Sequence, residues 1–259
     1  MLKSKLLILA LALPSIAVAQ VPDHMAMGRA RIEARDPQAA LEHFKAHLVA
    51  EPSSYEANWR AALALIDIGK QTPDSVRSTR RDSLYAEAER YARKATEANP
   101  GDAEGHFALS VAIGRASLTR SKRERVRRAS EIRVEALKAI ELNARHDGAY
   151  HVLGRWNAEI MRLSAMERFF AKSFLGGSIF NQASWDRAIE YMERSVTLAP
   201  TTIYHQLDLA EIYIDRKRYG DARRHLEQIA TLPIVDVMDP RYQSDAVLLL
   251  SRIENKSDR

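Results

Sequence analysis

The sequence predicts an all-α protein, an α-solenoid of about five helical hairpins with a C-terminal capping helix. Three observations predict this class: a pattern of small and bulky residues recurs along the chain, clear breaks separate segments of helical periodicity, and the composition favours helix. Hydrophobic residues make up 46% of the 259 residues and charged residues 28%, with only 10 Gly and 9 Pro, as expected of a mostly helical globular protein. The sequence has no cysteine, which excludes disulfides, thiolate metal sites and cysteine nucleophiles.

The recurring pattern is a small residue, a second residue four positions later and a third after three more, usually followed by a proline. Its clearer copies begin at Ala40, Ala88, Ala188 and Ala222, and a weaker copy begins at Ile132. Such repetition indicates stacked helical hairpins, because one hairpin cannot bury its apolar face alone. A stack of this kind is typical of a binding scaffold rather than of a catalytic site.

Residues 1–19 have the pattern of a secretory signal peptide. Lys3 and Lys5 precede an apolar run, and residues 17–19 (Ala-Val-Ala) form a small-residue cleavage signal. The alternative is an uncleaved anchor, but the apolar run of about 14 residues is shorter than the ~20 that a spanning helix needs. We therefore expect an exported, periplasmic protein cleaved after Ala19. Loss of the two lysines lowers the formal charge from +5 to +3, which favours no nucleic acid partner.

Helix start and stop signals divide the remaining chain into units. We expect a single solenoid domain over residues 20–259, with repeats near residues 21–54, 55–102, 103–146, 147–202 and 203–236, and a capping helix at 239–256. Several breaks combine a residue that can cap a helix with a proline, which is tolerated in the first turn of a helix but not in its interior.

In the first unit, a helix from Met25 to Ala34 precedes a second helix that ends near Ala50. In the second unit, Ser53 is expected to cap a helix, and a long polar stretch then leads to a partner helix at 84–98. That stretch is longer than a compact turn needs, so the partner helix starts early or follows a loop.

The third unit pairs helices at 103–118 and 126–142 through a long, very basic connection. The fourth unit opens near Asp147, and its second helix begins only at Ser184, so residues 158–183 form an insertion inside the hairpin. The fifth unit has no insertion. An apolar stripe on the last helix suits the terminal cap of a solenoid.

The fourth and fifth units carry the residues of a known repeat. These are Tyr150, Leu153 and Gly154 in the fourth, and Leu209, Ala210, Tyr213, Ala222 and Leu226 in the fifth. They resemble the tetratricopeptide repeat (TPR) signature, in which small residues lie where two helices touch and bulky residues fill the adjacent holes. The resemblance covers most of residues 21–233 and implies a right-handed TPR-type α-solenoid.

A narrower resemblance begins at His151. The run 151–156 (His-Val-Leu-Gly-Arg-Trp), the pair Glu167-Arg168 and the pair Gly176-Gly177 are similar to the regulator of microtubule dynamics (RMDN) family, as are the basic run before Val134 and the long insertion. Eukaryotic members of that family are TPR proteins associated with microtubules and membrane contact sites. The resemblance implies the fold. The export signal departs from the family's setting, because an exported protein would meet no microtubules.

The first helix of each hairpin lines the concave face of a TPR stack, and placing the repeats in register gives a candidate peptide-binding groove. Its residues are Arg29, Trp59, Phe107, Arg115, His151, Arg155, Tyr204 and Glu211. Aromatic rings and arginine supply much of the binding energy at interfaces, so this groove suits a protein or peptide. In the alternative, Trp59 and Phe107 pack against the insertions and the groove is closed. The Lys and Asn pair of carboxylate-clamp TPR proteins is absent from these positions, so we do not expect capture of a free C-terminus.

Two other segments give an alternative function. The basic segment 120–133 suits an acidic peptide or anionic lipid, although a solvated face is the simpler interpretation; it lacks the interleaved aromatic residues that stack nucleic acid bases. The insertion 158–183 is either an amphipathic helix that touches a membrane or partner, or an extra helix packed on the solenoid. Together the two segments define a membrane-surface or microtubule-regulator-like binding protein as the alternative to the groove.

No catalytic, metal or cofactor site is predicted. His43 and His47 have the helical spacing of paired metal ligands, but no third ligand is evident. No Gly-rich phosphate loop, nucleophile-base spacing or paired-carboxylate motif stands out. The sequence thus predicts a non-enzymatic scaffold of the cell envelope, and leaves its oligomeric state open.

Overall fold

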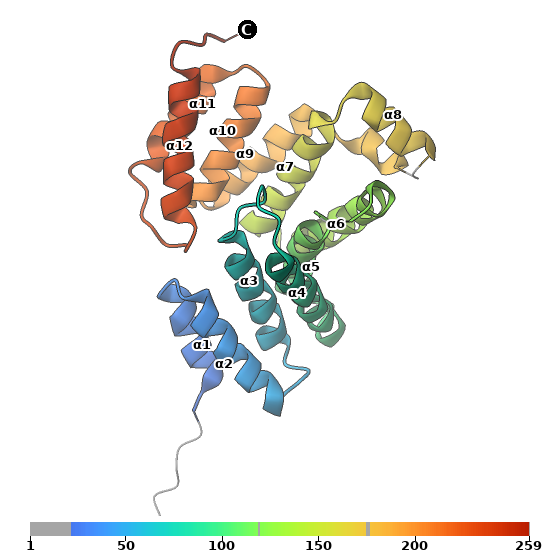
Figure 1. Ribbon diagram of the computed structural model, residues 1–259, viewed down its shortest axis with the longest axis vertical. Coiled ribbons are helices and arrows are strands. Elements are labelled where there is room, and N and C mark those ends of the chain that lie inside the picture. Colours follow the sequence, from blue (N-terminus) through green and yellow to red (C-terminus); the bar gives the residue numbers. More distant parts are fainter. Residues whose placement is uncertain (1–21, 119, 175–176, 259) are drawn as a thin grey trace, which may run out of the picture.

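The computed structural model describes residues 22–118, 120–174 and 177–258. These residues form twelve α-helices and one 3-10 helix, η1, and contain no strand (Figure 1). The helices pair into consecutive hairpins, which confirms the predicted all-α solenoid. The predicted signal peptide at 1–19 lies outside the described residues.

The first two units are formed by four helices: α1 (His24–Glu33), α2 (Pro37–Ala50), α3 (Tyr55–Lys70) and α4 (Thr79–Ala98). Asp36 caps α2, because its Oδ1 accepts a hydrogen bond from the Ala39 amide at 3.0 Å. The predicted cap of α3 at Ser53 is wrong: Ser54 occupies the cap position, and its side chain forms no capping hydrogen bond.

Helix α4 begins before the predicted residue 84. The Ser78 hydroxyl caps its first turn by accepting from the Arg81 amide at 3.2 Å. The Arg81 guanidinium donates to the carbonyls of Pro73 and Val76 at 2.6 and 3.0 Å. These bonds hold the preceding loop against the helix. Because α4 begins at Thr79, the end of the predicted polar stretch is helical and only the part before it is a loop.

The third and fourth units contain α5 (Ala103–Ala116), α6 (Lys122–Leu142), α7 (Asp147–Arg162) and α9 (Trp185–Leu198). The long basic connection expected before residue 126 is shorter than predicted, because Ser121 caps α6 through the Glu124 amide at 3.3 Å. Most of the basic segment therefore lies on a helix. The insertion holds α8 (Ala165–Phe174) and η1 (Ser178–Gln182).

The fifth unit consists of α10 (Ile203–Asp215) and α11 (Tyr219–Ile229), and α12 (Asp239–Ile253) packs on both. The tight turns of the first and fifth hairpins are alike. Arg35 and Lys217 both have a φ of 60°, the left-handed conformation that often closes a helix. In each turn the next residue, Asp36 or Arg218, donates to a carbonyl five residues earlier at 2.9 Å. The repeat is thus preserved in its backbone as well as in its sequence.

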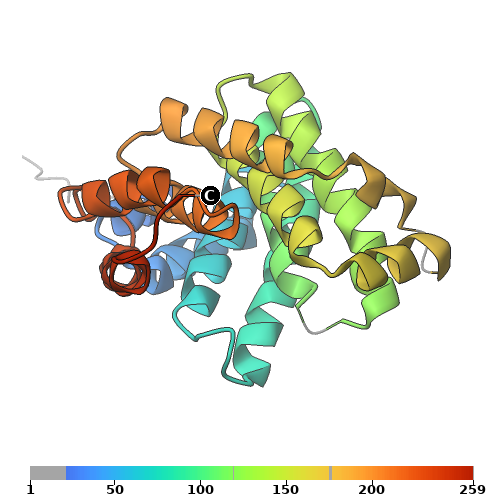
Figure 2. The same ribbon diagram turned by 90° about the horizontal axis from the view of Figure 1, so that it is seen from above.

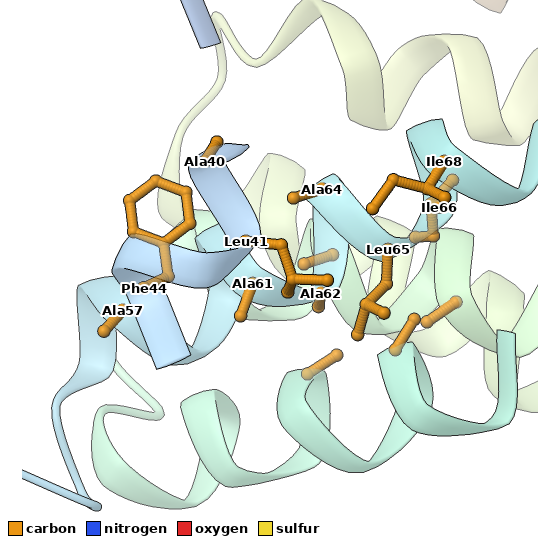
Figure 3. Close-up of a cluster of buried hydrophobic side chains, with 14 of the residues drawn as sticks. Ala40, Leu41, Phe44, Ala57, Ala61, Ala62, Ala64, Leu65, Ile66 and Ile68 are labelled. Atoms are coloured by element: carbon orange, nitrogen blue, oxygen red, sulfur yellow. The ribbon is translucent and has the colours of Figure 1, made fainter. Parts of the chain in front are cut away.

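The small residues of the recurring pattern lie in the core. Ala40, Ala88, Ala188 and Ala222 are all fully buried, as the helix contacts of the pattern predict. Figure 3 shows one such cluster, in which Phe44 of α2 lies beside alanines of α3. A Cβ at Gly28 of α1 would collide with the Phe44 ring, so glycine permits the close approach of the first two helices.

The hairpins follow a curved path. Figures 1 and 2 show α12 on one side of the molecule and α8 on the opposite side. The segment before α12 returns to the first hairpin, where the Ile234 carbonyl accepts a hydrogen bond of 3.4 Å from Arg35 Nη1. In the ranges that the structure describes, no helix is both long and apolar enough to cross a membrane.

Candidate functional site

The first helices of successive units form the inner face of the solenoid. Helix α3 packs on α5, α5 on α7 and α7 on α10, and α12 packs on α10. This arrangement is the one expected when stacked hairpins curve, and it brings together side chains that are far apart in the sequence.

Asp208 of α10 is the centre of a polar cluster on this face. Its Oδ2 accepts a hydrogen bond of 2.6 Å from His151 Nε2, and its Oδ1 accepts one of 2.8 Å from Arg155 Nη1. Burial would raise the pKa of Asp208, but the charge of Arg155 and the bond from His151 lower it well below its usual value. The carboxylate is therefore ionised and joins α7 to α10.

The two partners of Asp208 are held by the same network. Burial lowers the pKa of His151 to about 4 despite the bond to Asp208, so the imidazole is neutral at pH 7 and donates through Nε2. Arg155 also bonds Glu159 Oε1 through Nη2 at 3.2 Å. Since both amino groups of Arg155 already have partners within the chain, a ligand carboxylate would have to compete with them.

Glu211 lies one helical turn beyond Asp208 and is less firmly paired. Its one ion pair within the described ranges is with Arg162, at 3.8 Å. Burial, followed by repulsion from Asp208, raises the pKa of Glu211 to about 7, although Arg155 and Arg162 oppose the shift. Near neutral pH this carboxyl group can therefore act either as a donor or as an acceptor of hydrogen bonds.

Two tyrosines lie beside the cluster. The rings of Tyr204 and Tyr242 are 6.4 Å apart, and Tyr204 meets His151 edge to face at 4.9 Å. Burial raises the pKa of both phenols, so both remain protonated. Neither hydroxyl has a hydrogen-bond partner among the residues that the structure describes.

Arg115 of α5 connects this region to the second unit. Helix α5 packs on α3, and against the larger effect of burial the charge of Arg115 lowers the pKa of Tyr242 of α12. Its contact with Asp74, an exposed carboxylate, is 3.4 Å long. Arg115 is thus the least firmly paired cation of the inner face that was predicted from the sequence.

The remaining predicted groove residues lie in other surroundings. Arg29 pairs with Glu56 at 3.0 Å. Trp59 packs on the core of the first units with the Arg60 guanidinium 4.3 Å from its ring centre. Phe107 packs on the His146 ring at 4.6 Å. No contact within the described ranges joins these three predicted residues to the Asp208 cluster, so the structure unites only part of the predicted set.

Sequence reasoning missed Asp208 and Tyr242. Asp208 follows Tyr204 by four residues and precedes Glu211 by three, and this spacing places all three on one helix face. The signal was therefore present. Tyr242 belongs to the apolar stripe of the last helix and packs there, but its ring also lies 6.4 Å from that of Tyr204.

The histidine pair of α2 has other partners. His43 Nδ1 lies 3.1 Å from His24 Nδ1, and His47 lies 3.5 Å from Glu51. Among the described residues, no group of three potential ligands is arranged to hold a metal ion.

Paired helices, buried small residues at each crossing and an inner face lined by the first helices together define a TPR-type α-solenoid. The sequence profile of the regulator of microtubule dynamics protein 1-3 family matches residues 26–254. The chain therefore belongs to this family, as its run from His151 to Trp156 suggested.

Individual relatives are more distant. Regulator of microtubule dynamics protein 1 of Bos taurus is 24% identical over 208 residues, which cover 80% of this chain and 64% of that protein. A thermophilic TPR protein of Thermus thermophilus, TTC0263, has 17% identity and a TM-score of 0.62, with 87% of this chain and 98% of that chain covered. PilF of Pseudomonas aeruginosa has 15% identity and a TM-score of 0.52, with 89% and 90% covered. At these identities the solved structures support the fold alone.

Proposed function

We propose that this protein is a non-enzymatic scaffold that binds a protein or peptide on the inner face of its solenoid. The TPR fold and membership of a regulator family point to binding rather than catalysis. The observation that carries the proposal is the pair Tyr204 and Tyr242, whose hydroxyls have no partner within the described part of the chain. Tyrosine offers a large apolar ring and a polar tip, the combination that favours interface hot spots.

The neighbouring charges define the chemistry of the partner. Glu211 can donate or accept near neutral pH, which suits the amide groups of a peptide backbone. Arg115 has only a long contact with Asp74, so it can turn to an acidic side chain of the partner. Arg155 and His151 orient Asp208 and support the face, rather than contact the partner directly.

A peptide library selected on the full chain would test this proposal. We expect Tyr204→Ala or Tyr242→Ala to weaken a selected peptide by more than tenfold, since truncating a hot-spot residue costs on the order of 2 kcal/mol. Binding is measured by fluorescence polarisation with the labelled peptide.

Tyr191→Ala is the matched control, because Tyr191 lies on α9, a second helix of its hairpin, beside Tyr150. It should leave the affinity within about twofold, as expected of a residue outside the interface. The inner face is refuted as the site if Tyr191→Ala weakens binding as much as Tyr204→Ala and Tyr242→Ala do. It is also refuted if neither Tyr204→Ala nor Tyr242→Ala changes the affinity.

The place of action is part of the proposal. Residues 1–19 have the pattern of a cleaved export signal, which supports action in the cell envelope. The bovine relative is named for microtubule dynamics, and this chain covers 64% of its length. Co-sedimentation with polymerised tubulin tests a microtubule-regulator-like role, which saturable binding would support.

A second candidate function is binding to a membrane surface, and the outer side of α8 favours it. Met166 is 69% and Phe169 61% exposed, while Ala171 on the same helix belongs to a buried cluster that includes Val126 of α6. The insertion therefore packs on the solenoid by one face and presents aromatic and aliphatic side chains on another. Such an amphipathic helix suits the interface of a bilayer.

Basic side chains border this apolar surface. Lys122 of α6 is close enough to Glu167 of α8 to lower the pKa of that carboxyl group, together with bonds from Ser164, which have the larger effect. Lys122, Arg123 and Arg125 are exposed, and no ion pair is found for them in the described ranges. Their charge favours an anionic bilayer.

Flotation with phosphatidylserine-containing vesicles would test this second candidate. Glutamine at Lys122, Arg123 and Arg125 together, or Phe169→Ser, should abolish flotation, whereas vesicles of phosphatidylcholine alone should not bind. Flotation that is indifferent to both sets of substitutions would exclude this surface.

A further inference from the structure

A hollow lies where the first two hairpins meet the segment before α12, and its lining does not include the tyrosines of the inner face. It has a volume of about 330 Å³, within the lower range of small-ligand pockets. Its walls come from the start of α2, the end of α3, the start of α4 and Val237. Residues that are distant in the sequence therefore build one site.

The charged lining of this hollow is mainly basic. Arg35, Arg80 and Arg81 line it, and Asp36 is its one carboxylate among the described residues. The Asp36 carboxylate already accepts from the Ala39 amide to cap α2. Arg81 is also paired with Asp82 and Asp74, at 3.3 and 3.8 Å, so within the described ranges Arg35 and Arg80 supply the unpaired positive charge that favours an anion.

Arg81 forms the rigid wall of the site. It is 5% exposed, and it bonds the carbonyls of Pro73 and Val76 and Asp82 at 3.3 Å. Its Nε is buried without a hydrogen-bond partner in the described part of the chain, and an unpaired donor of this kind is costly. The guanidinium is thus fixed in place and still has bonding capacity.

Arg35 and Arg80 are the available cations. Both are exposed. Arg35 makes only the long bond of 3.4 Å to the Ile234 carbonyl, and the Arg80 guanidinium has no ion pair or hydrogen bond with any residue in the described ranges. Two of the three guanidinium groups can therefore turn toward a ligand.

The backbone adds to this preference. Pro37 and Gln38 begin α2, and Arg80 and Arg81 lie in the first turn of α4. The positive ends of two helix dipoles thus meet basic side chains, an arrangement that an anion would stabilise. On the other side, Ile68, Leu84 and Val237 supply apolar lining.

We propose that this hollow binds a small organic phosphate. Arg35 and Arg80 hold the phosphate oxygens beside Arg81, because guanidinium groups match phosphate geometry with paired hydrogen bonds. The apolar lining contacts the carbon part of the molecule. Because Arg35 and Val237 come from opposite ends of the solenoid, the bound ligand also fastens the last loop to the first hairpin.

Calorimetric titration of the full chain at constant ionic strength tests the site, with phenyl phosphate and inorganic phosphate as probes. We expect saturable binding of both, with phenyl phosphate the tighter. Arg80→Gln or Arg35→Gln should weaken phenyl phosphate by about tenfold, the loss of one charge-assisted hydrogen bond.

Arg77→Gln is the matched control, because Arg77 is an exposed arginine just before α4 that does not line the hollow. It should change the affinity by less than about twofold, as expected from a screened surface charge. Absence of saturable binding, or equal weakening by Arg77→Gln, would overturn the proposal. Equal affinity for the two probes would overturn the contribution of the apolar lining.

Discussion

Arg128 of α6 and Glu89 of α4 form an ion pair of 2.8 Å between side chains that are only 11% and 12% exposed. Burial would raise the pKa of Glu89, but its bonds from Arg128 and Arg93 lower it. The pair joins the second and third units. One arginine of the basic segment therefore has a structural role that the exposed arginine beside it, Arg127, does not share.

Arg128→Ala should lower the free energy of unfolding by about 2 kcal/mol, because it removes a charge-assisted hydrogen bond from a nearly buried carboxylate, which keeps only its bond from Arg93 at 2.7 Å. Arg127→Ala is the control: Arg127 pairs with Glu124 but is 70% exposed, so its loss should cost less than about 0.5 kcal/mol. Urea denaturation of the two variants gives the comparison. Equal midpoints would show that the α4–α6 pair contributes no stability.

Gly154→Ala should destabilise the fourth unit. The added Cβ would lie 3.0 Å from Met192 Cε and 3.2 Å from the Met192 backbone nitrogen, so α7 and α9 would have to separate at a cost of about 1–3 kcal/mol. A Cβ added at Gly114 of α5 would lie no closer than 3.9 Å to another atom, at Ile132. Gly114→Ala should therefore stabilise the protein by up to about 1 kcal/mol, because alanine favours a helix more than glycine does. Thermal melts that shift in the same direction would contradict this interpretation of the helix contacts.

Glu211→Gln should stabilise the protein at pH 8 and have little effect near pH 4.5. The pKa of Glu211 rises from its usual value of 4.5 to about 7 on folding. The folded chain therefore holds this proton more tightly, and the associated stability is present below pH 4.5 and lost as the pH rises toward 7. Glutamine cannot ionise, so the variant avoids the loss.

The measurement is the difference in denaturation midpoint between the two proteins from pH 4.5 to 8. His151, whose pKa is lowered to about 4 on folding, has the opposite effect: it lowers the stability of the protein as the pH falls below 6.5. Because both proteins contain His151, this effect cancels in the difference. Glu227→Gln, on the exposed side of α11, is the control. A difference that does not grow with pH would show that Glu211 ionises normally.

Replacing Ala17 and Ala19 with leucine should leave an uncleaved precursor, because signal peptidase requires small side chains at these positions. N-terminal sequencing and fractionation of the expressed full chain give the result. A product that still begins at Gln20 would show that the cleavage site lies elsewhere.

The hairpins could be predicted because their pattern depends on local contacts. Ala188 and Gly154 are small because α7 and α9 touch at these positions, and any sequence that stacks hairpins in this way must show the same spacing. The starts of α4 and α6 were predicted less accurately. Ser78 and Ser121 determine them through single capping hydrogen bonds, which the periodicity of the sequence does not reveal.

The candidate site was predictable only where its residues share one helix or adjacent repeats. His151, Arg155, Tyr204 and Glu211 follow from the register of the fourth and fifth units. Tyr242 reaches them from α12, whose position depends on the path of the preceding loop rather than on the repeat. The predicted aromatics Trp59 and Phe107 are drawn into packing instead, because apolar rings beside a core lower the free energy by burial.

The hydrogen bond between Arg35 and Ile234 joins residues that are 199 positions apart. In an open array of repeats, each end frays independently, because every unit touches only its sequence neighbours. Here the outermost hairpin also has a neighbour from the other end of the chain. Hydrogen exchange of α1 and α2 should therefore respond to cleavage of the segment before α12, and unfolding should be more cooperative than nearest-neighbour coupling alone would make it.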